Sequence, residues 1–319
     1  MTDQKIVPLH SFAPVQRLSG AARVALIAPS SPLISATDLE HAIENVHQFG
    51  WTPVVGDHVL VRDGYLAGTD TQRLDDLNRA LRDDTVDAIW CLRGGYGVTR
   101  ILDGIAYDAV RRHPKPIIGY SDITALHAAV GRECEIVTYH GPTARSTITP
   151  FSRNSFERAL VFGEDPCGTS HSARTIRAGT ARGRVMGGNL ALVAALVGTR
   201  YALDLRQAIL VLEDVNEPIY RIDRMLRQLW MSGALVNLAA LAFGQCTASD
   251  EDIPAAEASS SSPPERRRTL DDVLREVADS FNIPCVAGLP IGHVDDQWTL
   301  PLGSLATLDA DTLTLTIDS

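Results

Sequence analysis

The sequence has little of what would tie a protein to a metal, a nucleic acid or a membrane. Its five cysteines form no close pair such as Cys-x-x-Cys, so no metal or cofactor site is expected, and the odd count fits a reducing compartment. Lys and Arg number 29 against 39 Asp and Glu, and a net charge of -10 argues against a phosphate backbone as partner. No apolar run approaches the ~20 residues that span a bilayer.

The first ten residues, Met1 to His10, also lack two features of a secretory signal. They have neither a basic start nor a continuous apolar core. We therefore expect a cytoplasmic protein.

What the sequence does have is enough apolar material for a large core. Of its 319 residues 45% are hydrophobic and 21% are charged, which is typical of a globular protein of two domains. In the first half, strand-like and helix-like patterns alternate, which predicts a parallel α/β sheet with its site at the carboxyl ends of the strands. The strands are expected at residues 24–28, 54–55, 88–91 and 116–119, and the helices at 37–49, 71–82, 101–112.

A second, smaller α/β domain is expected in the C-terminal half. Apolar strands at 209–212, 240–243 and 286–289, with a helix at 221–230, indicate it. Residues 162–168 contain two glycines and a proline and are typical of a linker. The expected domains are 1–165 and 180–319, with the active site between them. The Ser- and Pro-rich stretch 249–268 is expected to be a surface loop, either a lid or an inert insertion.

Ser121 follows the apolar run Pro116–Gly119 and precedes a helix-like pattern. A hydroxyl on such a strand-to-helix turn projects from the edge of a sheet, where the free N–H groups of the helix can stabilise an oxyanion. Ser121 is therefore a candidate nucleophile. The alternative is a helix cap.

A glycine-rich turn follows the strand at 88–91. Gly94 and Gly95 let the backbone approach a ligand closely, and an N–H group here could be a second oxyanion donor. The spacing fits neither a dinucleotide-binding loop nor a P-loop. Simple turn geometry is the alternative reading.

A serine nucleophile needs a base and a carboxylate that orients it. His293, on the loop after an apolar strand, is the preferred base, and His140 is its rival. Glu213 at the end of a strand is the preferred acid, because a strand end is held rigidly. Glu217 is the other candidate for the acid.

Together these segments resemble the LD-carboxypeptidases, or muramoyltetrapeptide carboxypeptidases, a serine peptidase family that includes the microcin C immunity peptidases. The resemblance implies Ser121 as nucleophile, Glu213 as orienting acid and His293 as base, with an oxyanion hole from the N–H groups of Gly95 and Asp122. The matching stretches follow the family's order along nearly the whole chain: Leu26–Pro32, Arg93–Gly97, Gly119–Asp122, His140–Pro142, Gly187–Leu190, Leu212–Asp214 and Gly288–His293.

The resemblance also implies a reaction. The bond cleaved would join an L-centre, as in meso-diaminopimelate or lysine, to a terminal D-alanine, through an acyl-enzyme. A cytoplasmic enzyme of this kind would act on imported muropeptides in cell-wall recycling, and the family suggests a homodimer. Arg93 is a candidate for binding the terminal carboxylate, or else part of a structural ion pair.

Two other functions remain open from the sequence. One is cleavage of a peptidyl-adenylate analogue, as in the immunity peptidases. The other is a non-catalytic protein that captures small peptides in the same cleft.

Overall fold

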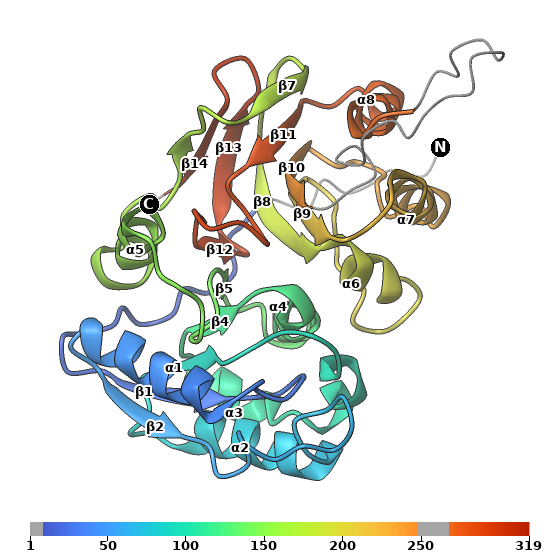
Figure 1. Ribbon diagram of the computed structural model, residues 1–319. Coiled ribbons are helices and arrows are strands. Elements are labelled where there is room, and N and C mark those ends of the chain that lie inside the picture. The colour runs from blue at the N-terminus through green and yellow to red at the C-terminus, as the bar shows by residue number, and fades with distance from the viewer. Residues whose placement is uncertain (1–8, 248–267, 319) are drawn as a thin grey trace, which may run out of the picture.

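Two open sheets organise the computed structural model, which describes residues 9–247 and 268–318 (Figure 1). The sheet of the N-terminal half occupies the lower part of Figure 1, and the sheet of the C-terminal half lies above it. The expected α/β class with parallel strands in each half is confirmed. Most of the expected Ser- and Pro-rich loop lies outside the described residues.

The first sheet has the strand order β12-β5-β4-β3-β1-β2. Its five N-terminal strands are parallel, so their carboxyl ends share one edge. The C-terminal half contributes β12, which pairs antiparallel with β5. The bounds are β1 (Arg23–Ile27), β2 (Thr52–Val55), β3 (Ala88–Cys91), β4 (Ile117–Gly119), β5 (Thr138–His140) and β12 (Leu300–Leu302).

The helices α1 (Ala36–Gln48), α2 (Asp70–Arg82), α3 (Tyr107–Arg112) and α4 (Thr124–Cys134) accompany this sheet. The first two begin at capping boxes, whose N-cap residues are Ser35 and Thr69. One expected helix, 101–112, was wrong in its first half, where the 3₁₀ turn Leu102–Gly104 precedes α3. Asn78 bonds to the backbone of Gly104 and Ala106, which holds the chain in a turn there.

The second sheet has eight strands in the order β6-β14-β13-β8-β9-β10-β11-β7. Strands β8, β9, β10 and β11 are parallel and form its centre. The bounds are β6 (Gly168–Thr169), β7 (Arg174–Arg177), β8 (Thr180–Asn189), β9 (Ala208–Val215), β10 (Ala240–Thr247), β11 (Cys285–Leu289), β13 (Leu305–Asp309) and β14 (Thr314–Ile317), with helices α6 (Leu190–Ala195), α7 (Ile219–Met231) and α8 (Leu270–Phe281).

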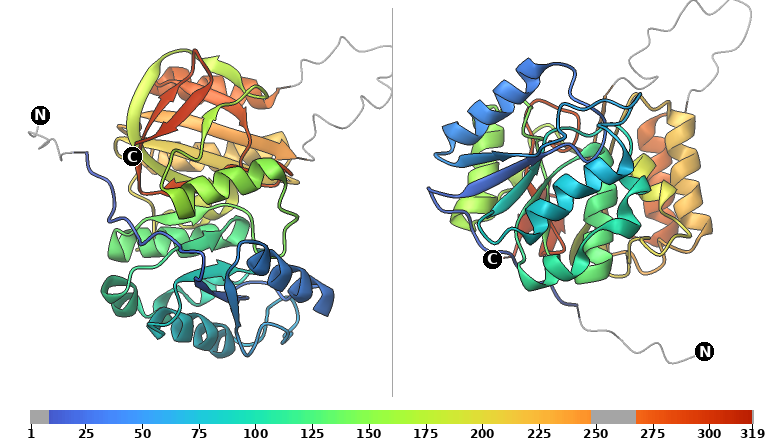
Figure 2. Two further views of the ribbon diagram at one scale, coloured as in Figure 1. Left: turned by 90° about the vertical axis from the view of Figure 1, so that its left-hand side faces the viewer. Right: turned by 90° about the horizontal axis from the view of Figure 1, so that it is seen from below.

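The two halves are connected through α5 (Pro150–Glu157) and a π-helical turn, Arg158–Phe162. They stay on opposite sides of the molecule in the left view of Figure 2. A direct contact joins them where the backbone N–H of Asn189, at the end of β8, donates to Thr124 Oγ1 at the start of α4 (2.9 Å). None of the helices in the described ranges combines the length and apolarity that a membrane span requires.

Candidate active site

Ser121 lies on the turn between β4 and α4 with its backbone in the left-handed region, at φ 64°. A non-glycine residue there is strained, and such strain gathers at functional sites. No side-chain capping bond is formed at the start of the short 3₁₀ turn that begins at Ser121, or at the start of α4. The half-buried hydroxyl is thus available for chemistry.

The glycine-rich loop after β3 packs directly on this serine. A Cβ atom on Gly94 would lie 2.8 Å from Ser121 Cβ and 3.0 Å from its Oγ, which no side chain could tolerate. Gly95, whose φ is 113°, packs against Ser31 instead and is exposed. The peptide between the two glycines, which carries the Gly95 N–H, therefore adjoins the nucleophile.

The side chain of Asp122 holds three loops together behind the serine, a role that the sequence analysis missed. Its buried Oδ2 accepts hydrogen bonds from Ser30 Oγ (2.6 Å) and from the backbone N–H of Val98 (2.9 Å). Burial raises the pKa of this carboxyl, and the two hydrogen bonds lower it in part. Asp122, Ser30 and Val98 follow β4, β1 and β3, respectively. The Asp122 carboxylate therefore fixes the glycine-rich loop relative to Ser121.

Glu213 and His293 meet in the C-terminal half. His293 Nδ1 lies 2.8 Å from Glu213 Oε2, and the Glu213 side chain is fully buried near the end of β9. Gly292 has a φ of 90°, and a Cβ on it would overlap the Glu213 carboxyl group. With Nδ1 bound to the acid, Nε2 is the ring nitrogen left to exchange a proton.

The other acid of this segment has a different partner. Glu217, which precedes α7, has its Oε2 3.6 Å from Arg221 in the first turn of that helix. An ion pair between residues four positions apart, at the start of a helix, is a local structural contact. The structure thus brings Glu213, and not Glu217, to His293.

Tyr120 connects the base to the nucleophile across the two halves. Its ring lies edge-on to the His293 ring at 4.9 Å, and its backbone leads directly into Ser121. The rival base, His140, lies farther from Tyr120, at 6.2 Å, and is fully buried. Burial lowers the pKa of His140 to about 4, and among the described residues neither of its ring nitrogens has a hydrogen-bond partner.

Asp214, next to the orienting acid, points to the other side of β9. It accepts from Asn189 Nδ2 (3.0 Å) and from the N–H groups of Ala191 (3.0 Å) and Val215 (2.9 Å). Burial raises the pKa of this carboxyl to about 6. Asp214 therefore ties β9 to the end of β8 and leaves Glu213 to His293.

Arg93 is half-buried and donates from Nη1 to the carbonyl of Pro32 (2.7 Å). In residues 9–247 and 268–318 Arg93 forms no ion pair with a carboxylate. The alternative role for Arg93, a structural ion pair, is therefore not found among these residues. Burial first, and then the charge of Arg145, lowers the pKa of its guanidinium. An arginine in this setting favours an added anion.

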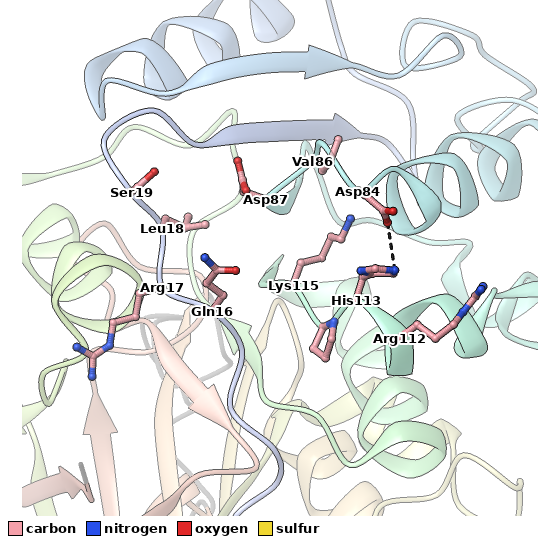
Figure 3. A pocket seen from close by; sticks show the side chains of 11 residues that line it. Gln16, Arg17, Leu18, Ser19, Asp84, Val86, Asp87, Arg112, His113 and Lys115 are labelled. Carbon is pink, nitrogen blue, oxygen red and sulfur yellow. Dashed lines mark ion pairs between the residues drawn. The ribbon is translucent and has the colours of Figure 1, made fainter.

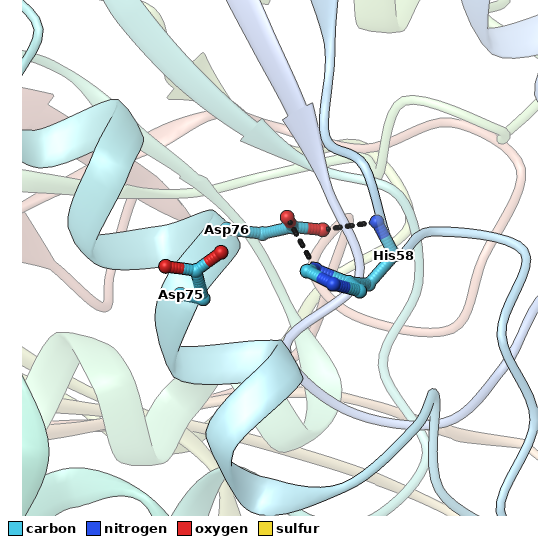
Figure 4. A group of neighbouring side chains, drawn as sticks. All are labelled: His58, Asp75 and Asp76. Carbon is cyan, nitrogen blue, oxygen red and sulfur yellow. Dashed lines mark hydrogen bonds and ion pairs between the residues drawn. The ribbon is translucent and has the colours of Figure 1, made fainter.

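Two other features of the surface lie away from this site. A pocket of about 250 Å³ is lined by residues such as Lys115 and Asp87, which precede β4 and β3, so it opens at the amino ends of the strands (Figure 3). In the second, His58 lies 2.9 Å from Asp76, with Asp75 beside them (Figure 4). Arg79 already pairs with both aspartates, which makes this a structural ion-pair network.

Comparison with known proteins places the chain among carboxypeptidases. The family pattern described as "LD-carboxypeptidase N-terminal domain" matches residues 24–141, and "LD-carboxypeptidase C-terminal domain" matches residues 182–308. The "Murein tetrapeptide carboxypeptidase" of Pseudomonas aeruginosa is 36% identical over 91% of this chain and 94% of its own. A Streptomyces coelicolor relative is 39% identical over 95% of each chain.

Solved structures have the same fold. The muramoyltetrapeptide carboxypeptidase from Oxalobacter formigenes superposes with a TM-score of 0.77 at 26% identity, over 93% of this chain and 98% of its own. The microcin C7 self immunity protein MccF, in complex with glutamyl sulfamoyl guanosine, superposes with a TM-score of 0.84. At 23% identity, over 98% of this chain and 99% of the other, that likeness concerns the fold alone.

Proposed function

This chain belongs to the LD-carboxypeptidase family and is a serine-type carboxypeptidase, and we propose that it releases D-alanine from the carboxyl terminus of muropeptides. The observation that carries the proposal is the pairing of Glu213 with His293 beside Tyr120, next to a serine in the left-handed conformation. The alternative of a non-catalytic binding protein does not account for this assembly or for the family.

In the proposed reaction, Ser121 Oγ attacks the carbonyl carbon of the amide before the terminal D-alanine. His293 Nε2 takes the hydroxyl proton, and Glu213 stabilises the imidazolium that forms. When the tetrahedral intermediate collapses, the C–N bond breaks and His293 gives the proton to the leaving amine. Water then adds to the acyl-enzyme with His293 as base, which releases the shortened peptide and restores the serine.

The oxyanion would be stabilised by two backbone N–H groups, those of Gly95 and Asp122. Both adjoin Ser121, one through the Gly94 contact and the other as the next residue of the chain. The Asp122 side chain holds the loop that carries the Gly95 N–H in place through the N–H of Val98. Donors fixed in advance stabilise a developing charge without reorganisation.

A carboxypeptidase must also bind the free terminal carboxylate of its substrate, and we assign this to Arg93. Its neighbour Gly94 packs against Ser121, so Arg93 belongs to the loop that adjoins the nucleophile. One Nη is used on the Pro32 carbonyl, and the remaining N–H groups can bind a carboxylate.

The broader setting of the enzyme is also part of the proposal. Five cysteines without a disulfide suit a cytoplasmic enzyme that recycles imported muropeptides. We further propose domains at residues 1–165 and 180–319 and a homodimer, which light scattering would test. The strand β12 would then be a part of the second domain that completes the sheet of the first.

The test is mass spectrometry of the protein incubated with the tetrapeptide L-Ala-γ-D-Glu-meso-diaminopimelate-D-Ala. Loss of one alanine is the expected result, and the same peptide ending in L-alanine is the matched control that should persist. Cleavage of a peptidyl sulfamoyl adenosine with no release of D-alanine would support the immunity-type function instead.

A further inference from the structure

Arg73 of α2 lies beneath two loops of the candidate site, and its side chain has no exposed surface. Nη1 donates to the carbonyl of Pro29 (2.6 Å) and to the carbonyl of Gly97 (2.8 Å). Pro29 belongs to the loop between β1 and α1, which we call the β1 loop (residues 28–35), and Gly97 ends the glycine-rich loop after β3. One guanidinium group therefore joins two loops that are far apart in the chain.

The peptide group between Gly97 and Val98 is held at both ends. Arg73 donates to its carbonyl, and its N–H donates to Asp122 Oδ2 (2.9 Å). The Asp122 carboxylate also accepts from Ser30 in the β1 loop. Burial raises the pKa of the Asp122 carboxyl, and the charge of Arg73 is among the influences that lower it. Two buried side chains of opposite charge thus fix this peptide group and the β1 loop beside it.

Gly97 leaves the space that the guanidinium group occupies. Its φ is 138°, in the region that favours glycine, and a Cβ atom on it would lie 2.8 Å from Arg73 Nη1. The same Cβ would lie 2.7 Å from Leu66 Cδ2. The last glycine of the loop is therefore needed for the contact with Arg73, as Gly94 is needed for the contact with Ser121.

The β1 loop in turn holds the N–H group that we assign to the oxyanion hole. The Ser31 N–H donates to the Gly94 carbonyl (3.4 Å), and the Tyr96 N–H donates to Ser31 Oγ (3.1 Å). These two hydrogen bonds flank Gly95 on either side. A side chain that fixes the two loops relative to each other therefore also fixes the Gly95 N–H relative to Ser121.

The other end of the Arg73 guanidinium is anchored by a carboxylate. Its Nη2 donates to Asp70, which also accepts from Nε and from Nη2 of Arg100 (2.9 Å each). Arg100 ends the 3₁₀ turn that begins at Val98, so Asp70 binds the segment directly after the glycine-rich loop. This ion pair offsets part of the cost of burying the Arg73 charge.

We propose that Arg73 is a positioning residue of the oxyanion hole. Together with Asp122 it holds the Gly97–Val98 peptide and the β1 loop, and it thereby keeps the Gly95 N–H directed at the oxyanion before the substrate binds. Because the oxyanion develops only as the serine attacks, the effect falls on kcat rather than on KM. The inference rests on the proposed function, to which it adds a buried residue of α2.

Arg73→Gln removes the charge and leaves one amide group to serve two carbonyls. We expect its kcat on the tetrapeptide to fall by about 10- to 100-fold, with KM within about twofold of the wild type. Arg73→Lys keeps the charge and can donate to both carbonyls, so it should recover part of kcat, to about 3- to 10-fold below the wild type. It is also the second variant if Arg73→Gln does not fold. Arg79→Gln, at an exposed position of the same helix, should leave both constants unchanged.

Labelling with a fluorophosphonate probe, which phosphonylates an active serine with loss of fluoride, measures the same site without a peptide. The rate constant for labelling of Ser121 should fall in the Arg73 variants in proportion to kcat. The final extent of labelling should match that of the wild type, whereas a smaller folded fraction would lower the extent and leave the rate constant unchanged.

These two readouts separate the inference from the proposed function. If the wild type hydrolyses the tetrapeptide, the ratio of kcat values decides, and if it does not, slower labelling of the Arg73 variants still supports the inference. A folded Arg73 variant with the wild-type kcat and labelling rate, or with a loss confined to KM, overturns the inference and leaves the carboxypeptidase in place. A wild type that neither reacts with the probe nor hydrolyses the peptide overturns both proposals.

Discussion

His293 Nδ1 and Glu213 Oε2 lie 2.8 Å apart, although the two residues are separated by 80 positions in the chain. Both come from the C-terminal half, His293 from the loop after β11 and Glu213 from near the end of β9, whereas Ser121 comes from the N-terminal half. The base is thus oriented within one half before the nucleophile is presented by the other. Activity consequently depends on how the halves dock, through contacts such as Thr124 with Asn189.

Glu213→Gln should lower kcat by roughly 10²- to 10⁴-fold, because the amide cannot stabilise an imidazolium as a carboxylate does. Glu217→Gln is the matched control, since the ion-pair partner of Glu217 in the described part of the chain is Arg221, and the substitution should change kcat less than about threefold. Steady-state kinetics on the tetrapeptide measures both variants. If Glu217→Gln were the more damaging substitution, the assignment of the acid would be wrong.

Gly94→Ala should reduce kcat at least tenfold, because the new Cβ would lie 2.8 Å from Ser121 Cβ and would displace the nucleophile. Gly20→Ala places a Cβ where no atom lies within 4 Å, so its kinetics should match the wild type. Circular dichroism at matched temperatures would show that both variants keep the fold. Normal turnover by Gly94→Ala would contradict the close contact.

Ser30→Ala tests the role of Asp122 as a positioning residue. Loss of the 2.6 Å hydrogen bond leaves Val98 as the partner of Oδ2, so the glycine loop should move relative to Ser121. We expect kcat to fall several-fold with KM nearly unchanged, because the donors aimed at the oxyanion act in the transition state. Ser30→Thr, which keeps a hydroxyl, should recover part of the loss, and an effect on KM alone would count against this role.

His127 should make the protein sensitive to acid. It is buried in α4 with Nε2 bonded to the Gly119 carbonyl (2.9 Å), and burial lowers the pKa of its imidazole to about 3. The His127 imidazole therefore stays neutral in the folded protein, whereas in the unfolded chain it takes up a proton below the ordinary pKa of histidine. The stability that this histidine contributes is present above pH ~6.5 and is lost as the pH falls toward the folded value.

Between pH 6.5 and 4 the loss from this one group amounts to about 3 kcal/mol. Denaturant unfolding at several pH values should accordingly show a shallower acid slope for His127→Gln than for the wild type. Equal slopes for His127→Gln and the wild type would mean that the imidazole is not held neutral.

The sequence was most informative where local pattern and function coincide. The apolar run that stops at Gly119 indicated the turn at Ser121, because a buried strand is visible in the sequence as a short apolar run that ends at a glycine. The choice between Glu213 and Glu217 as the orienting acid could not be made from the sequence, because both lie close to the same strand end. The structure distinguishes them by their partners, since Glu213 bonds to His293 and Glu217 pairs with Arg221.

Other parts had no local signature. β8 was missed because its glycines give no alternating apolar pattern, and only packing explains them: a Cβ on Gly188 would meet Thr124 Oγ1 at 2.5 Å.

The most direct test of the account is release of D-alanine from the tetrapeptide by the wild type and by Ser121→Ala, followed by mass spectrometry. The account predicts release by the wild type and none by the variant, with both proteins folded alike by circular dichroism. Release at the wild-type rate by Ser121→Ala would contradict the assignment of the nucleophile, and intact peptide with both proteins would contradict the proposed substrate.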